Sequence, residues 1–391
     1  MDQSFLDKGL AQTTLHPIGI RIERGQGSYL YGSDGQRYLD FISGIGVSSF
    51  GHGHPEIVSA VHAQVDKHLH AMVYGEFRQA AQEQAAANLL ALLPEKLNAV
   101  YFVNSGAEAI DAAMKLARRT TGRSKIQSFT GGYHGNTFGA LSVSSNVERK
   151  SPFLPLVGDV ELLSWNDDAA LNSIDDSTAA VILETIQGDA GIRIPDTSWL
   201  QALRKRCTET GTLLILDEIQ CGMGRTGSPF AFEHFDVQPD VLCLGKALGG
   251  GLPIGAVVAN RADMIAFADA PALGHITTFG GHPVPCAASA VATRLLSQMD
   301  WHRVETVGLR IESTLRATAA VKDVRRKGLY IAVVLESKER VNALVSNALE
   351  QGVLVFYFLS TPDAFRIAPP LNITDEELEH GLAVLQELLD A

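Results

Sequence analysis

The stretch LLILDEIQ, residues 213–220, sets four aliphatic residues directly before the acid Asp217. A uniformly apolar run of this kind is typical of a strand in a parallel sheet that helices cover on both faces. The runs AVYFV (99–103), AVIL (180–183) and VLCLG (241–245) repeat the pattern, and a polar residue follows each of them. Ligands of open α/β sheets bind at the carboxyl ends of the strands. The sequence therefore predicts an α/β fold whose functional groups lie at that edge.

Amphipathic stretches alternate with these short runs, which indicates a largely parallel sheet. The expected strands and helices are residues 99–103, 107–121, 125–129, 180–183, 199–210 and 213–216. We assign this pattern to a large domain over residues 46–285.

The pattern changes after about Pro283. The elements expected there are long helices at 287–299 and 301–320, strands near 327–335 and 353–358, and a final helix from Thr374. They predict a smaller α+β domain over residues 286–391. Residues 1–45 hold short strands around turn residues, and we expect this N-terminal segment to pack with the smaller domain.

The apolar segment 241–259 is long enough to suggest a membrane span. Three adjacent glycines, Pro253 and a central Lys246 argue against one, because each weakens a continuous helix or puts a charge at bilayer depth. Two short buried strands around a glycine-rich turn are the better prediction.

Composition argues against several classes of protein. The chain has 391 residues, of which 46% are hydrophobic, and a formal net charge of −12, which disfavours nucleic acid as a partner. The N-terminus resembles no secretory signal, so a cytoplasmic protein is expected. The four cysteines lie far apart without a CxxC pair, so we expect neither a metal site nor disulfides.

The motif NSGAEA (104–109) follows an apolar run and opens a predicted helix. Backbone N–H groups at such a helix start, together with the Ser105 hydroxyl, form an anion site. Ser105 and Glu108 also have the spacing of a capping box, which is the preferred interpretation of this motif taken alone.

Asp217 is the second chemical signal, because a carboxylate at a strand end can pair with a buried cation such as a protonated pyridine nitrogen. A solvated turn is the ordinary alternative for an isolated acid. The glycines of GMGRTG (222–227) match a dinucleotide-binding pattern, but that site requires a helix after them, whereas Gly-Ser-Pro follows. We reject the dinucleotide interpretation.

Lys246 is the third signal, a single lysine among small and apolar residues in LGKALGGG (244–251). Burial lowers the pKa of a lysine toward nucleophilic competence, while the alternative is a lysine that reaches the surface. The order of the three signals favours the chemical interpretation: an anion loop, a strand-end acid and a buried lysine, each after its own strand.

The amino-acid sequences of these motifs resemble those of the class III aminotransferases of the ornithine, acetylornithine and 4-aminobutyrate type. The resemblance rests on SGAEA, GGYHG, LDEIQCGMGRTG, LGKALGGGLPIGA, TTFGGHP and FRIAPPL, spread from residue 104 to residue 371, and on GSYLYGSDGQRYLDFISGIGV and FGHGHPEI before them. It implies a fold-type I transferase that depends on pyridoxal 5′-phosphate.

The resemblance assigns catalytic roles to Lys246 and Asp217. Lys246 is expected to hold the cofactor as an imine and to move the proton between the substrate carbon and the cofactor. Asp217 is expected to keep the pyridine nitrogen protonated, so that the ring can accept the electrons of the substrate C–H bond.

Other residues are matched to cofactor binding by the same resemblance. Gln220 matches the residue that hydrogen-bonds the ring hydroxyl, and Tyr133 the aromatic residue that stacks on the ring. The residues matched to the phosphate cup are Ser105, Gly106 and Ala107. Thr278 matches a threonine that reaches the phosphate from the neighbouring subunit, which implies a homodimer with shared active sites.

Arg366, in FRIAPPL, matches the arginine that binds the α-carboxylate of glutamate and 2-oxoglutarate. This match implies an amino donor and a 2-oxo acid acceptor as the small-molecule partners. Asp189 occupies the position of a glutamate that pairs with this arginine in several relatives, and its side chain is one methylene shorter.

Three positions depart from the family pattern around the substrate. Asn136 stands where an arginine typically holds a substrate carboxylate, and Leu15 and Ile45 stand where ornithine enzymes carry tyrosines. The donor is therefore expected to be either a less acidic ω-amino acid or amine, or one held by another cation such as Arg149 or Arg193. The sequence leaves both alternatives open.

Two other functions share these motifs in part. An aminomutase or decarboxylase with the same cofactor would keep Lys246 and Asp217, and Arg366 favours transamination over them. A binding protein with a relict cofactor pocket would be favoured if Lys246 or Asp217 were missing, and both are present.

Overall fold

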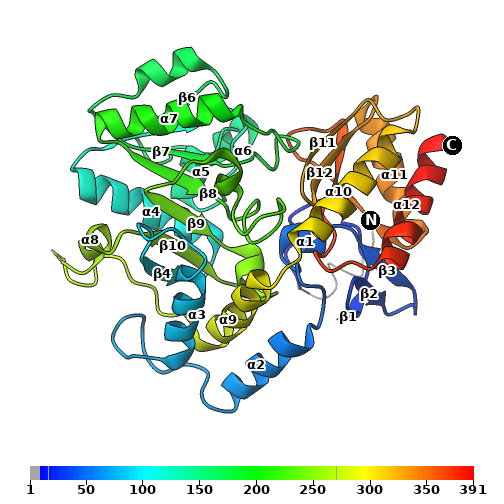
Figure 1. The fold of residues 1–391 in the computed structure, drawn as a ribbon, viewed down its shortest axis with the longest axis horizontal. Helices are drawn as coiled ribbons and strands as arrows, with labels where there is room; N and C mark the ends of the chain where they lie inside the picture. The colour runs from blue at the N-terminus through cyan, green and yellow to red at the C-terminus, as the bar shows by residue number, and fades with distance from the viewer. Residues whose placement is uncertain (1–8, 16, 270) are drawn as a thin grey trace.

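The computed structural model describes residues 9–15, 17–269 and 271–391, which form a large unit and a smaller one (Figure 1). The first eight residues of the expected N-terminal segment lie outside the described residues. The large unit holds a seven-stranded sheet in the order β4-β10-β9-β8-β7-β5-β6. Its strands are β4 (Ala99–Val103), β5 (Lys125–Phe129), β6 (Val160–Leu163), β7 (Thr178–Glu184), β8 (Leu213–Asp217), β9 (Val241–Leu244) and β10 (Gly255–Ala259). Only β10 pairs antiparallel with its neighbours within this sheet, which confirms the predicted α/β fold with a mostly parallel sheet.

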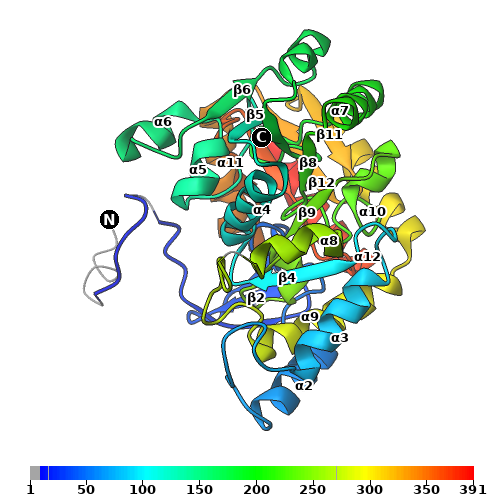
Figure 2. The same ribbon diagram turned by 90° about the vertical axis from the view of Figure 1, so that its left-hand side faces the viewer.

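Helices cover both faces of this sheet (Figures 1 and 2). The helices of the large unit are α2 (Pro55–Val65), α3 (Ala80–Leu90), α4 (Gly106–Thr121), α5 (Phe138–Val143), α6 (Val147–Lys150), α7 (Thr197–Thr210), α8 (Arg261–Met264) and α9 (Pro283–Ser297). Short 3₁₀ helices are η2 (Ser151–Phe153), η3 (Asp168–Ser173), η4 (Ala231–Phe235), η5 (Lys246–Gly249) and η6 (Ile265–Phe267). Along β8, Ile215 packs in the core with α4 and α5, while Leu214 and Leu216 join the core with α7 and α9. Successive strand residues face opposite layers, so both must be apolar.

The smaller unit contains two four-stranded sheets. One sheet has the order β11-β12-β15-β14 and the other β1-β2-β3-β13. The strands are β1 (Ile22–Gln26), β2 (Tyr29–Gly32), β3 (Arg37–Asp40), β11 (Asp323–Lys327), β12 (Tyr330–Val334), β13 (Val353–Leu354), β14 (Phe356–Tyr357) and β15 (Ala364–Ile367). The helices are α1 (Ser43–Gly46), α10 (Trp301–Arg316), α11 (Lys338–Glu350) and α12 (Asp375–Asp390). Because β3 pairs in parallel with β13, the N-terminal strands share a sheet with the C-terminal part of the chain.

Two features differ in detail from the sequence expectations. The single strand expected near 353–358 is divided into β13 and β14, which belong to different sheets. The boundary expected at residue 285 falls inside α9, which packs on α2 and α3 and shares the core of the large unit. We therefore propose that the large domain extends to about residue 298.

The apolar segment 241–259 forms β9 and β10, joined by the glycine-rich η5. Within the described part of the chain, no helix has the length and apolar character needed to cross a bilayer. All four cysteines are buried and unpaired.

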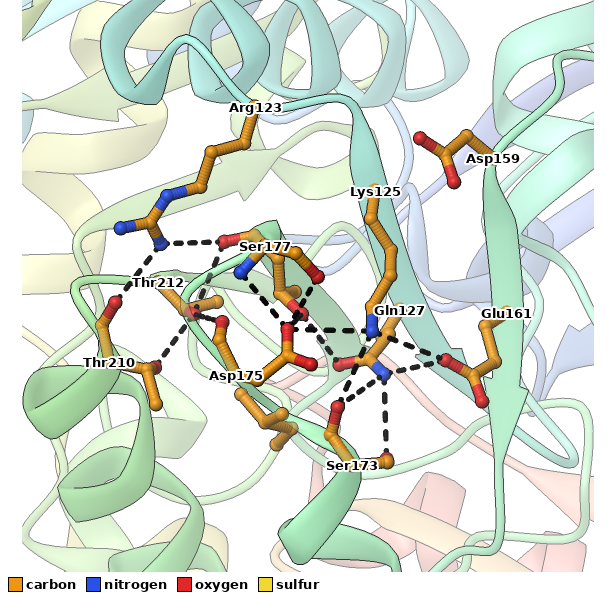
Figure 3. A network of polar contacts seen from close by, with 12 residues as sticks. Arg123, Lys125, Gln127, Asp159, Glu161, Ser173, Asp175, Ser177, Thr210 and Thr212 are labelled. Carbon is orange, nitrogen blue, oxygen red and sulfur yellow. Dashed lines mark hydrogen bonds and ion pairs between the residues drawn. The ribbon is translucent and has the colours of Figure 1, made fainter.

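A polar network holds the sheet toward the amino-terminal ends of its strands (Figure 3). Arg123 donates hydrogen bonds to the carbonyls of Thr178 (2.9 Å) and Thr210 (3.0 Å). Gln127 donates to Glu161 over 2.7 Å. These contacts join β5, β6, β7 and the end of α7, and they leave the carboxyl ends of the strands free for other groups.

Arg225 joins the two units from a fully buried position, with 1% of its surface exposed. Its guanidinium donates to the carbonyls of Leu329 (3.2 Å) and Pro369 (2.6 Å) and to the Ser49 hydroxyl (2.9 Å). Burial lowers the pKa of Arg225 to about 10, which leaves the side chain charged at neutral pH. Charge-assisted hydrogen bonds to these three acceptors offset its desolvation.

Arg225→Ala is expected to lower the free energy of unfolding by about 3 kcal/mol, because three buried acceptors would each lose a donor. Urea unfolding of the holoenzyme measures the change. Arg261→Ala is the matched control, since Arg261 is exposed on α8, and it is expected to change stability by less than about 0.5 kcal/mol. Equal losses in the two variants would contradict the structural role of Arg225.

Candidate active site

A cavity of about 210 Å³ lies at the carboxyl ends of β7 and β8. Parallel pairing sets Glu184, the last residue of β7, beside Asp217, the last residue of β8. The other lining residues come from the start of α4, the loop before α5, the turn after β8 and η5: Gly106, Ala107, Tyr133, His134, Gly135, Asn136, Ile219, Gln220 and Lys246. The fold thus brings most of the expected cofactor-binding residues to one edge of the sheet.

Lys246 enters the cavity directly after β9. Its backbone has φ of 47°, a left-handed conformation that is rare outside glycine and that occurs at functional sites. Burial lowers the pKa of the Lys246 amine, and the nearby carboxylates of Asp217 and Glu184 oppose this shift. No hydrogen bond or ion pair within the described residues engages the amine. The amine is therefore available for nucleophilic attack.

Asp217 is 4% exposed, and both of its carboxylate oxygens have partners. One oxygen lies 2.7 Å from Nδ1 of His134, and the other accepts the Ile219 N–H over 3.0 Å. His134 is itself completely buried. The sequence gives His134 no role of its own, although it directly follows Tyr133 in GGYHG.

Glu184 is a second buried carboxylate in the cavity. It accepts the backbone N–H groups of Tyr133 (2.9 Å) and Gly188 (2.8 Å). Burial raises the pKa of Glu184 to about 7, and the Asp217 carboxylate adds to this shift. Glu184 was also not singled out from the sequence, and the available signal was its position as the polar end of an apolar strand beside β8.

The start of α4 is compatible with both interpretations of the NSGAEA motif, as a helix cap and as an anion site. Ser105 caps the helix, since its Oγ accepts the Glu108 N–H over 3.2 Å. The Ser105 hydroxyl keeps its own proton as a donor for a further acceptor. Gly106 has no room for a side chain, because a Cβ there would lie 2.8 Å from Cδ1 of Ile219. The helix start is thus closely packed and still has free N–H donors.

A second cavity of about 220 Å³ adjoins the first and shares Tyr133, Gln220 and Lys246 with it. It lies between the two units, and its remaining lining residues are Ile45, Arg149, Asp189, Phe356, Tyr357, Leu359 and Arg366. A molecule in this second cavity can therefore reach the Lys246 amine.

Arg366, on β15, is 7% exposed and lies over the ring of Phe358, with 4.3 Å from its guanidinium carbon to the ring centroid. Its Nη2 is 3.5 Å from the Asp189 carboxylate. Asp189 has closer partners, since it accepts hydrogen bonds from the Ser360 hydroxyl (2.6 Å) and the Leu359 N–H (3.2 Å). The Arg366–Asp189 contact is the weakest of these, so Arg366 can take another carboxylate.

The remaining predicted residues are divided among different places. Asn136 lines the first cavity and Ile45 the second. Thr278 is exposed and lines neither cavity, and Leu15 is exposed as well. Arg193 lines a separate cavity.

The first cavity fits pyridoxal 5′-phosphate. The packed helix start at Gly106 offers N–H donors for a phosphate group. Asp217 offers a buried carboxylate for a ring cation, and Lys246 an amine for a carbonyl group. The three chemical groups of the cofactor therefore each have a counterpart around one cavity.

Known proteins are similar to this chain both in sequence and in fold. The family model "Aminotransferase class-III" matches residues 10–389. The chain is 42% identical to the acetylornithine aminotransferase of Methanopyrus kandleri, with 100% of both chains covered. It is 38% identical to that of Methanosarcina mazei, with 94% of this chain and 91% of the relative covered.

Solved structures agree with the sequence comparison. The ornithine aminotransferase of Toxoplasma gondii, described with pyridoxal phosphate at partial occupancy, has a TM-score of 0.91 and 29% identity, with 99% of this chain and 93% of that chain covered. A transaminase from the marine bacterium Virgibacillus has a TM-score of 0.91 and 25% identity, with 100% and 98% covered. The chain belongs to the class-III aminotransferases and is a transaminase that uses pyridoxal 5′-phosphate.

Proposed function

We propose that this transaminase moves an amino group from an ω-amino acid or amine to 2-oxoglutarate in two half-reactions. The observation that carries the proposal is the buried Arg366, which lines the same cavity as Lys246. Its Nη2 makes only a 3.5 Å contact with the Asp189 carboxylate. A guanidinium in that setting binds a carboxylate through two parallel hydrogen bonds. The name of the curated relatives, acetylornithine aminotransferase, supports an ω-amino donor.

Pyridoxal 5′-phosphate, when bound, supplies a sink for the electrons released from the substrate C–H bond. Asp217 would hold a proton at the ring nitrogen of the bound cofactor, and the 2.7 Å contact with His134 keeps the Asp217 carboxylate oriented for this role. Gln220 and Tyr133 line both cavities, which is consistent with contacts to the ring oxygen and the ring face. Ser105, Gly106 and Ala107 bind the phosphate.

Lys246 would hold the cofactor through its amine and would carry the proton between the substrate carbon and the cofactor. Both tasks need a neutral amine for part of the cycle, and burial lowers its pKa in that direction. The left-handed backbone at Lys246 fixes the direction in which the side chain leaves the main chain.

We further propose a homodimer in which Thr278 reaches the phosphate of the neighbouring subunit. The segments around residues 74–76 and 264–276 support it, because both line an apolar cavity of about 500 Å³. They carry large hydrophobic side chains exposed in the single chain: Leu69, Met72, Phe77, Leu273, Ile276 and Phe279. Exposed apolar side chains around such a cavity are typical of a subunit interface, and Thr278 lies between Ile276 and Phe279 in the sequence.

Borohydride reduction of the yellow holoenzyme is expected to fix the cofactor on Lys246, because the Lys246 amine has no hydrogen-bond or ion-pair partner among the described residues. Peptide mapping locates the label. Lys150 is the matched internal control, since its amine is also partly buried but donates to the carbonyls of Ser142 (2.9 Å) and Ser144 (2.9 Å). Label on any peptide other than the one with Lys246 would overturn the assignment.

Asp217→Asn is expected to retain the cofactor absorbance and to lose roughly a hundredfold or more in turnover, since a neutral amide does not hold the ring proton. Steady-state kinetics at saturating cofactor measure the loss. Asp168→Asn, at an exposed acid on η3, is expected to behave as wild type. Turnover close to wild type in Asp217→Asn would remove Asp217 from this role.

Arg366→Ala is expected to slow the half-reaction with glutamate by more than about a hundredfold, on the order of 3 kcal/mol, because a desolvated charge pair loses one partner. An amine donor without a carboxylate should lose much less in its own half-reaction. Single-turnover rates of the two half-reactions test this difference. Equal losses would mean that Arg366 is structural, and 2-oxoglutarate would lose its main support as the acceptor.

A further inference from the structure

Arg149 lies at the second cavity and has no ion-pair partner in the part of the chain that the structure describes. It belongs to the short helix α6, lines the cavity together with Lys246 and Arg366, and is partly buried. Its guanidinium carbon is 5.6 Å from the centroid of the Tyr133 ring. No carboxylate among the described residues forms an ion pair with it. A partly desolvated guanidinium that faces a cavity is a ready partner for an anionic ligand.

The other candidate groups for this task lie elsewhere. Asn136 lines the first cavity and carries no charge. Arg193 lines a different cavity, with its guanidinium carbon 5.8 Å from the centroid of the Trp165 ring. Of the two cations that the sequence offers as substitutes for a family arginine, only Arg149 shares a cavity with Lys246.

The charges around the second cavity favour a ligand with two carboxylates. Two arginines, Arg149 and Arg366, face one acid, Asp189, which is already held by the Ser360 hydroxyl and the Leu359 N–H. The Nε of Arg366 is also buried without a hydrogen-bond acceptor among the described residues. Both guanidinium groups therefore have hydrogen-bonding capacity that the protein itself does not use.

We propose that Arg149 binds the second carboxylate of a dicarboxylate substrate, at the end remote from the reacting carbon. The proposal rests on the proposed function and extends it, because Arg366 binds the carboxylate next to the reacting carbon. Glutamate and 2-oxoglutarate have this pair of carboxylates. Arg149 then supplies, from α6, the positive charge that Asn136 in the loop before α5 lacks.

A purely structural role for Arg149 predicts a different result. If the guanidinium only packs on Tyr133, its loss affects every substrate equally, whatever charge the substrate carries. If it binds a carboxylate, its loss affects only molecules that carry the second carboxylate. Ligands of equal chain length with one or two carboxylates separate the two roles.

The first test measures the binding of glutarate and pentanoate to the holoenzyme by calorimetry. These five-carbon acids do not react and differ by one carboxylate. In Arg149→Gln, the affinity for glutarate is expected to fall about 10- to 100-fold, and that for pentanoate less than about threefold. Arg149→Lys keeps the charge and is expected to restore part of the affinity. Arg193→Gln is the matched control and should bind both acids as wild type does.

The second test compares single-turnover rates with glutamate and norvaline, which also differ only by the remote carboxylate. Arg149→Gln is expected to weaken the apparent affinity for glutamate and to leave norvaline unchanged. Equal effects on the two amino acids, or glutarate binding that does not depend on Arg149, would overturn the proposal.

The outcome also separates this proposal from the proposed function. A wild-type enzyme that binds glutarate through Arg149 but fails to react with glutamate would contradict 2-oxoglutarate as the acceptor and would support Arg149 as the carboxylate-binding residue. An enzyme that reacts with glutamate independently of Arg149 would do the reverse.

Discussion

Burial of the Asp217 carboxylate at the end of β8 is the constraint on which the rest of the site depends. A buried charge is tolerated only with hydrogen bonds to both oxygens, and Asp217 obtains them from His134 and the Ile219 N–H. His134 must therefore be held in place, and the Ser144 hydroxyl does so by accepting its backbone N–H over 2.9 Å. The loop that carries His134 also carries Tyr133 and Asn136, so the same requirement shapes the wall of the first cavity.

The second buried acid connects the two cavities. Glu184 accepts one N–H from the loop of Tyr133 and one from the loop that carries Asp189. Because β7 and β8 pair in parallel and in register, Glu184 and Asp217 end side by side. Burial raises the pKa of Glu184 to about 7 and the Asp217 carboxylate adds to this shift, while His134 and the two N–H bonds oppose it. Glu184 thus links a group on the cofactor side to a group on the substrate side through backbone contacts.

The second cavity exists only because the two units meet. Arg366 comes from the antiparallel sheet of the smaller unit, Asp189 and Arg149 from the large unit, and Ile45 from the N-terminal segment. The buried guanidinium of Arg225 joins the same units through Leu329 and Pro369. A shift of one unit against the other would change the contacts of Arg366, whereas the first cavity lies almost wholly within the large unit.

The sequence by itself determined the α/β class, the cofactor and the positions of Lys246 and Asp217. Each of these residues comes at the end of an apolar run. The signal therefore lies in the local sequence and can be recognised without a structure. His134 lies in a loop and not at a strand end, so this signal does not identify it, whereas Glu184 ends an apolar run as Asp217 does and carries the same kind of signal. Only the tertiary structure shows their contacts with Asp217, since β7 pairs with β8 and the His134 ring reaches the Asp217 carboxylate from the loop before α5.

Only the tertiary structure decided which of Arg149 and Arg193 lines the cavity of Lys246. Arg149 lies between Glu148 and Lys150 and Arg193 between Ile192 and Ile194, and neither setting shows which arginine reaches the cavity of Lys246. Only the packing of α6 beside Tyr133 brings Arg149 to the cavity of Lys246, while Arg193 lies over Trp165. The same holds for α9, whose place in the large unit depends on contacts with α2 and α3 far away in sequence. Local patterns identify strand ends, and long-range packing decides which side chains share a cavity.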